Sequence, residues 1–226
     1  DKLEAQMKVH PMRFEKFKGR IHYEDEHLAV ENMSGKVGKS EFLANMNYYL
    51  GQDKAIRKKD NHFSLQSAHL DFDELFNYNP PPAGKQLTPE DHEAVFNIYD
   101  LPFTDMNFVF DIKHLNYHRY LIDDFFGRAR TREDHYIFID TLSLRAAGGA
   151  ISMKGYFNGS DRNKIYLSPD MRIKNVDLDK LLFKFENFGQ EHLVSENLHG
   201  KLNGRLTGKI HVHADMVPIL DDSEIQ

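Results

Sequence analysis

The 226-residue sequence contains no cysteine and no tryptophan. Without cysteine, the chain cannot form disulfides, carry out thiol catalysis or hold zinc through thiolates. It also lacks any run of roughly 18 apolar residues, the length that a membrane-spanning helix needs. Basic residues are not in excess, because 29 Lys and Arg stand against 35 Asp and Glu, for a net charge of −6. We therefore expect no nucleic acid among its partners.

The chain does contain enough apolar material for a folded core. Hydrophobic residues make up 40% of it, and Phe (17) and Tyr (10) supply the aromatic rings. A chain of this length corresponds to one large domain or two small ones. It begins at Asp1 and shows no signal-peptide core, so we expect any targeting segment to lie outside it.

A strict alternation of apolar and polar residues runs from Leu198 to Ala214. Leu, Gly, Ile, Val and Ala occupy the even positions, whereas His, Lys, Asn, Arg and Thr occupy the odd ones. This pattern predicts a long β-strand with one buried face. Asn203-Gly204 alone would favour a hairpin turn, but such a turn would place Leu202 beside Arg205. We therefore expect one continuous strand that bends at a glycine.

Shorter alternating runs also indicate strands. Phe108, Phe110 and Ile112 would share one face, and the run 151–157 alternates in the same way. Helical signals are brief, and we expect helices only near 71–78, 88–97 and 177–195. The predicted fold class is mainly β: a long, twisted and curved antiparallel sheet, forming an open groove or half-barrel from repeated units, with a few short capping helices.

An internal repeat is the most informative feature of the sequence. Phe17-Lys-Gly-Arg recurs as Phe125-Phe-Gly-Arg, and each is followed by an acidic turn that ends in His. Leu70-Asp-Phe-Asp-Glu-Leu recurs in the same order as Val176-Asp-Leu-Asp-Lys-Leu. Such units stack by strand pairing, because none can bury its apolar face alone. We predict a first unit with a Pro-rich loop at 79–85, a second unit and the start of a third, which could share one continuous sheet. Their predicted bounds are 1–100, 101–197 and 198–226.

Several segments carry a further signal through their order and spacing. They are Phe17-Lys-Gly-Arg with its acidic turn and Gly38-Lys-Ser-Glu-Phe42, Leu65 to Leu75, Gly149 to Asn158, and Asn175 to Leu182. A last segment, Leu198-His-Gly-Lys-Leu-Asn-Gly-Arg-Leu-Thr-Gly208, alternates leucine with glycine over part of its length. Over residues 12–215, this arrangement resembles the AsmA-like proteins of the bacterial cell envelope. The insertion from Pro80 to Asp100 departs from the plain pattern of that family.

The resemblance implies a fold and a function. AsmA-like proteins are typically held in the inner membrane by an N-terminal helix, with their bulk in the periplasm, and are related to long proteins built from repeating β-groove units. Their apolar groove is associated with carrying phospholipid acyl chains between membranes, and they affect outer-membrane biogenesis. For this chain, the resemblance implies a non-enzymatic, periplasmic part of a membrane-anchored protein. Its partners would be phospholipid acyl chains and membrane proteins of the envelope.

No set of side chains indicates catalysis or a cofactor. His211 and His213 share a strand face and could bind a metal ion, but no third ligand is fixed, so a solvated face is the preferred interpretation. His114 and His118 have helical spacing within a predicted strand, and the pair Asp123-Asp124 is expected in a polar loop. We therefore predict no enzyme activity, no metal ion and no cofactor.

The apolar stripe leaves two interpretations open. It could line an open groove for lipid tails, or form the closed core of a β-sandwich that acts as a scaffold or recognises protein or polysaccharide. Alternation alone favours the closed core, whereas the repeat and the resemblance favour the groove. An enzyme is the weakest alternative. The candidate groove residues are Phe108, Phe110, Ile112, Leu202, Leu206 and Ile210.

Overall fold

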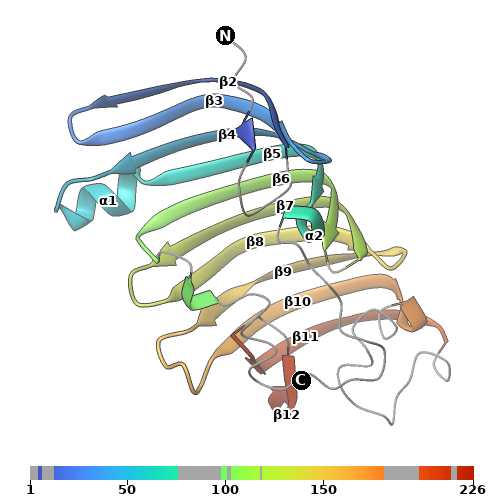
Figure 1. The fold of residues 1–226 in the computed structure, drawn as a ribbon. Coiled ribbons are helices and arrows are strands. Elements are labelled where there is room, and N and C mark those ends of the chain that lie inside the picture. The colour runs from blue at the N-terminus through green and yellow to red at the C-terminus, as the bar shows by residue number, and fades with distance from the viewer. Residues whose placement is uncertain are drawn as a thin grey trace. The chain divides into compact units, whose positions relative to one another are not determined.

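The computed structural model describes residues 5–6, 13–75, 98–100, 103–117, 119–180, 199–214 and 218–226. These residues form one sheet of 12 strands, in which each strand lies beside its neighbours in the chain (Figure 1). The first and last of these strands do not pair, so the sheet is not closed on itself. The mainly β fold and the single long sheet expected from the sequence are confirmed.

Most strands are long, and helical segments are few among the described residues. The strands are β1 (Ala5–Gln6), β2 (Arg13–Glu24), β3 (His27–Val37), β4 (Ser40–Tyr49), β5 (His62–Asp71), β6 (Met106–Tyr117), β7 (Tyr120–Arg132), β8 (Tyr136–Ala146), β9 (Gly149–Asn158), β10 (Tyr166–Asp177), β11 (Lys201–Val212) and β12 (Pro218–Ile225). The helical segments with both ends in the described residues are α1 (Lys54–Asp60), α2 (Phe72–Leu75) and the 3₁₀ turn η1 (Ile98–Asp100).

The chain divides into two compact units. Unit 1 comprises residues 1–79 and 105–130, and so contains β1 to β6 and most of β7. Unit 2 comprises residues 80–104 and 131–226, with η1, the end of β7, and β8 to β12. Because these units are defined by packing and not by sequence similarity, the predicted repeat units stay a prediction.

Tight turns join neighbouring strands within each unit. The chain passes from β2 to β3 through Asp25 and Glu26, whose φ angles are +47° and +62°. It passes from β8 to β9 through Ala147 and Gly148, whose φ angles are +49° and +74°. Two positive φ angles are typical of the type I′ turn, whose twist matches that of the strands it connects. The acidic turn found in the sequence is thus the tip of the β2–β3 hairpin.

One strand pair differs from the prediction. β5 and β6 run parallel, with Phe63 opposite Phe108 and Leu65 opposite Phe110. The expectation of antiparallel pairing throughout is wrong here, because the chain does not turn straight back at the end of β5. Parallel neighbours need a crossover connection, and the residues between Asp71 and Met106 supply it.

The two copies of the predicted repeat share a local irregularity. The register of β3 against β4 shifts between Val30 and Met33, and that of β8 against β9 shifts between Ile139 and Leu142. A β-bulge adds a residue to one strand and bends it. Equivalent strands of the two copies are therefore irregular at equivalent places.

The predicted helices are seen only where the chain is described. α2 lies within 71–78, and residues 178–180 begin a helical turn within 177–195. The predicted helix at 88–97, the Pro-rich loop at 79–85 and the remainder of 181–195 lie outside the described residues.

The long alternating run near the C-terminus forms β11, a continuous strand. Asn203 and Gly204 lie inside it and pair with β10, so the predicted continuous strand is confirmed and no hairpin forms there. The register against β12 shifts between Lys209 and His211, next to Gly208. This shift beside a glycine fits the expected irregularity.

Each unit has a small apolar core among its described residues. In unit 1 the core is formed by Leu70, Ile112 and Leu115, against which Leu65, Phe72, Leu75, Phe110, Tyr117, Ile122 and Phe125 pack. In unit 2 it is formed by Ile98, Phe157, Ile165 and Val212, with Tyr99, Phe103, Ile137, Leu167, Ile210 and Ala214 around them. Both cores combine strand residues with neighbouring helical turns, since Phe72 and Leu75 belong to α2 and Ile98 belongs to η1.

Candidate functional site: the apolar face of the sheet

The strand register aligns apolar side chains into rows that cross unit 1. Residues directly opposite each other on paired strands point to the same face. One row runs from β2 to β6 through Ile21, Val30, Met46, Phe63 and Phe108. All five side chains are apolar, so the row presents an uninterrupted hydrocarbon surface.

A second row continues this surface next to the first. It runs from β3 to β6 through Met33, Ala44, Leu65 and Phe110. The Phe110 ring centroid lies 5.9 Å from that of Phe108, so the two rows are in contact on β6. We call these nine residues the unit 1 apolar face.

The opposite face of the same strands is polar. One row there contains Asn47, His62 and Asn107, and another pairs Arg20 with Glu31. The two faces of β2 to β6 therefore differ in chemistry along most of their length, as alternation with a period of two predicts. Leu43 and Val109 are apolar exceptions on the polar face.

Unit 2 repeats this arrangement. One apolar row contains Ile137, Phe157, Leu167 and Ile210, on β8 to β11. Two further rows on the same face contain Leu142, Met153, Met171 and Leu206, and Leu144, Ile151, Ile173 and Gly204. We call these twelve residues the unit 2 apolar face.

The candidate groove residues fall into two groups of three. Phe108, Phe110 and Ile112 alternate along β6 in unit 1, and Ile112 is almost fully buried at 3% exposure. The other three, on β11 in unit 2, are Leu202, Leu206 and Ile210. Within each group the side chains share one apolar face, but the groups belong to different compact units.

Sequence reasoning missed most of the unit 1 apolar face. Ile21, Val30, Met46 and Phe63 were not among the candidates, although 62–67 alternates clearly. The bulge between Val30 and Met33 breaks the period of two in β3, so a simple alternation count loses the face there.

The apolar face of unit 1 reaches solvent at β2. Ile21 is 64% exposed and Tyr23 is 62% exposed, whereas Val30, Met46 and Phe63 are half-buried. A packed interior would bury such side chains almost completely. In this part of unit 1, the apolar rows thus form an accessible surface.

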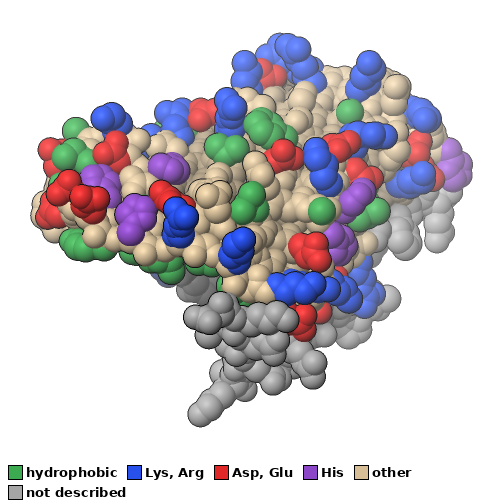
Figure 2. All heavy atoms as spheres, turned by 90° about the horizontal axis from the view of Figure 1, so that it is seen from above, with side chains coloured by type: hydrophobic (Ala, Val, Ile, Leu, Met, Phe, Trp, Pro, Cys, Tyr) green, Lys and Arg blue, Asp and Glu red, His purple; other side chains and the backbone are tan. Residues whose placement is uncertain are grey.

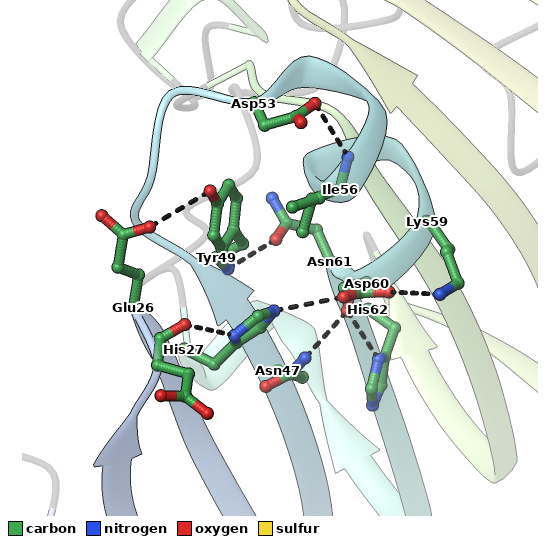
Figure 3. A network of polar contacts seen from close by, with 11 residues as sticks. Glu26, His27, Asn47, Tyr49, Asp53, Ile56, Lys59, Asp60, Asn61 and His62 are labelled. Atoms are coloured by element: carbon green, nitrogen blue, oxygen red, sulfur yellow. Dashed lines mark hydrogen bonds and ion pairs between the residues drawn. The ribbon is translucent and has the colours of Figure 1, made fainter.

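A polar network at one end of unit 1 is the main alternative site (Figure 3). His27 Nε2 lies 3.2 Å from an Asp60 carboxylate oxygen, and its Nδ1 lies 2.8 Å from the Asp25 carbonyl oxygen. The Tyr49 ring lies tilted against the His27 ring, with centroids 5.0 Å apart, and the Tyr49 hydroxyl donates to Glu26. Burial and the Glu26 carboxylate raise the pKa of Tyr49.

This network joins structural elements instead of presenting reactive groups. Asn61 is fully buried, its amide oxygen accepts the Tyr49 N–H at 2.6 Å, and its amide nitrogen donates to the Asp105 carbonyl at 2.9 Å. The contacts tie the β2–β3 turn, the end of β4 and the C-terminus of α1 together. The polar groups of this network bond to one another and to the backbone, as in a structural cluster that holds neighbouring elements together. We call it a clamp.

Other polar candidates do not assemble into a site. Among the described residues, no group of three or more His, Asp or Glu side chains is placed to hold a metal ion. His114 Nδ1 lies 2.7 Å from an Asp123 carboxylate oxygen at an exposed position. Asp123 and Asp124 lie within β7, so their expected place in a loop was wrong. His118 lies outside the described residues.

The charged surface is mixed in sign. Figure 2 shows Lys and Arg side chains next to Asp and Glu over the visible face, without a broad field of either sign. A basic stripe that would follow a nucleic-acid backbone is not visible on this face. No helix within the described part of the chain has the length and apolar character to cross a membrane.

Comparison with protein-family models, curated proteins and solved structures finds no match to this chain. The geometry of the apolar faces is therefore the main basis for assigning a function.

Proposed function

We propose that the apolar face of the sheet binds the acyl chains of phospholipids. In this proposal the chain is a periplasmic, non-enzymatic part of an AsmA-like protein, anchored in the inner membrane by a segment outside this sequence. It contributes to phospholipid transport between the inner and outer membranes or to outer-membrane biogenesis. Its other partners are membrane proteins of the envelope.

The observation that carries the proposal is the uninterrupted apolar row from β2 to β6. Strands lie roughly 4.8 Å apart, so this row spans about 19 Å between Ile21 and Phe108. The hydrocarbon core of a bilayer is about 30 Å thick, so one leaflet's acyl chain reaches about 15 Å. A single acyl chain can therefore lie along the row, across the strands.

The energy of this contact is sufficient for binding. Each CH₂ group moved out of water contributes about 0.8 kcal/mol. Even half of an acyl chain would then gain several kcal/mol, against the cost of ordering a flexible tail. Exposed Ile21 and Tyr23 give the chain a place to enter, since their side chains already meet solvent.

The test places a charge on the apolar face where the fold tolerates it. Ile21→Lys changes an exposed residue of the apolar row, and His22→Lys makes the matched change on the adjacent, exposed polar-face position. Each protein is incubated with vesicles of phosphatidylethanolamine and phosphatidylglycerol, reisolated, and examined by native mass spectrometry. We expect bound phospholipid on the original protein and on His22→Lys, and at least several-fold less on Ile21→Lys.

Photo-crosslinking gives a second, independent readout. A photoreactive phenylalanine at Phe63 should crosslink to lipid, and one at His62, on the opposite face, should not. Absence of lipid on every protein, in both measurements, would contradict acyl-chain binding.

A further inference from the structure

Unit 2 carries a cluster of aromatic rings on its polar face. Tyr136 and Phe138 of β8 lie beside Tyr156 of β9, with ring centroids 6.5 and 6.4 Å from it. Tyr166 of β10 lies 6.1 Å from Tyr156. We call these four residues the aromatic patch.

The aromatic patch lies on the face opposite the unit 2 core. Phe138 is opposite Tyr156, whereas their sequence neighbours Ile137 and Phe157 belong to the core side. The four rings are half-buried, so part of each meets solvent. Polar side chains usually cover the solvated face of a sheet. A group of partly exposed aromatic rings there is a common feature of binding surfaces.

Hydrogen bonds hold the tyrosines of the aromatic patch in place. The side-chain amide of Asn158 donates to the hydroxyl of Tyr136 at 2.9 Å and to that of Tyr166 at 3.1 Å. The ammonium group of Lys209 lies 4.3 Å from the Tyr166 ring centroid. The rings are thus fixed before any ligand arrives, which lowers the entropic cost of binding.

A shallow open depression of about 400 Å³ adjoins the aromatic patch at Tyr156. Its lining includes polar groups of several kinds, with Asp140, Lys154, Ser168 and Asp170 among them. Asp170 is held by Arg205, whose Nε and Nη2 donate to its two carboxylate oxygens at 2.7 and 2.9 Å. The depression therefore offers both hydrogen-bond donors and acceptors, with charges of both signs.

We infer that the aromatic patch and its adjoining depression bind a carbohydrate chain. A sugar ring has an apolar C–H face, which packs on aromatic rings, and a rim of hydroxyl groups, which both donate and accept hydrogen bonds. The aromatic patch would pack against the C–H face of the sugar, and the lining of the depression would form hydrogen bonds with its hydroxyl groups. The aromatic patch and the depression extend over residues of β8, β9 and β10, so a chain of sugars could contact all three strands.

Other ligands fit this surface less well. An acyl chain would have to cover the charged side chains of Asp140, Lys154 and Asp170, and removing these charges from water costs binding energy. The two carboxylates would repel the phosphates of a nucleic acid. The aromatic patch belongs to unit 2, whereas the row proposed to bind acyl chains belongs to unit 1, so this inference does not rest on the proposed function.

Binding is tested with neutral oligosaccharides. The original protein is titrated with chitohexaose, cellohexaose and maltohexaose, followed by isothermal calorimetry and by tyrosine fluorescence, which is measurable because the chain has no Trp. We expect at least one of the three to bind. Tyr156→Ala should weaken that binding by about tenfold or more, and the matched Tyr23→Ala, in unit 1, should leave it unchanged.

A gentler variant guards against loss of folding. Lys154 is exposed, so Lys154→Ala should preserve the circular dichroism spectrum while it weakens sugar binding several-fold. Sugar binding that is equal in the original, Tyr156→Ala and Lys154→Ala proteins would overturn the inference. So would the absence of binding to all three sugars at millimolar concentration, or a co-purifying protein that is lost on Tyr156→Ala when no sugar binds. Ile21→Lys should bind sugar normally, which separates failure of this site from failure of the lipid site.

Discussion

At the scale of single residues, buried polar side chains fix the ends of the strands in unit 1. Asp71 closes β5 and sits among several donors: its carboxylate accepts from the Glu74 N–H at 3.0 Å and from the Asn116 amide at 3.1 Å. The Lys39 ammonium lies 3.6 Å away. Burial raises the pKa of Asp71, but these three groups outweigh it, so its pKa lies below the ordinary value of 3.8.

This lowered pKa predicts an acid-dependent loss of stability. The folded protein binds the Asp71 proton less tightly than the unfolded chain does, so the contribution is full above pH 3.8 and is lost as pH falls through the folded-state pKa. Urea unfolding at pH 7 and pH 3 should show a smaller difference for Asp71→Asn than for the original protein. An unchanged difference would show that Asp71 does not contribute to it.

Asn61 supports a second prediction at this scale. Asn61→Ala leaves the Tyr49 N–H and the Asp105 carbonyl buried without their partner, which should cost about 2–4 kcal/mol of unfolding free energy. The matched Asn163→Ala, at an exposed turn position, should change it by less than about 0.5 kcal/mol. Both are measured by urea unfolding, and equal effects would contradict a clamp at Asn61.

At the scale of elements, the sequence predicted which segments are strands and which of their faces are apolar. β11 followed the alternation directly, including its passage through Asn203-Gly204. The bulge in β3 and the parallel pairing of β5 with β6 could not be predicted, because both depend on which distant strand supplies hydrogen bonds. The aromatic patch was hidden for the same reason, since Tyr136, Tyr156 and Tyr166 meet only through cross-strand register.

Close approach between β9 and β10 gives a prediction for this scale. At Gly155, where φ is +152°, an added Cβ would clash with the carbonyl oxygen of Ser168. Gly155→Ala should therefore force the two strands apart and lower the unfolding free energy by about 1–3 kcal/mol. Gly204→Ala is the control, because a Cβ there meets nothing within 4 Å. Similar unfolding midpoints for both variants would contradict the close approach.

At the scale of the whole molecule, an open sheet must leave apolar surface unburied or cover it with something else. Among the described residues, Ile21 and Tyr23 remain mostly exposed. Exposed apolar surface lowers solubility, and on a folded protein it often marks a binding site. Lipid binding is the use that we propose for it, on the basis of the sequence's resemblance to AsmA-like proteins; alternation alone could not separate this use from an ordinary core. The strand register supports that use, because it joins single apolar stripes into rows long enough for an acyl chain.

Ligand-dependent stability tests this use on the intact chain. A molecule that binds only the folded state stabilises it by about 2.7 kcal/mol at a hundred times its Kd, which raises the melting temperature by about 5 °C or more for a chain of this size. Lysophosphatidylcholine, kept below its micelle concentration, should produce such a shift in the original protein and in His22→Lys. The shift should shrink in Ile21→Lys, because a charge on the apolar row must be desolvated when the acyl chain covers it. Equal shifts in all three proteins would place the acyl chain away from this row, since the two substitutions add the same charge on opposite faces of one strand.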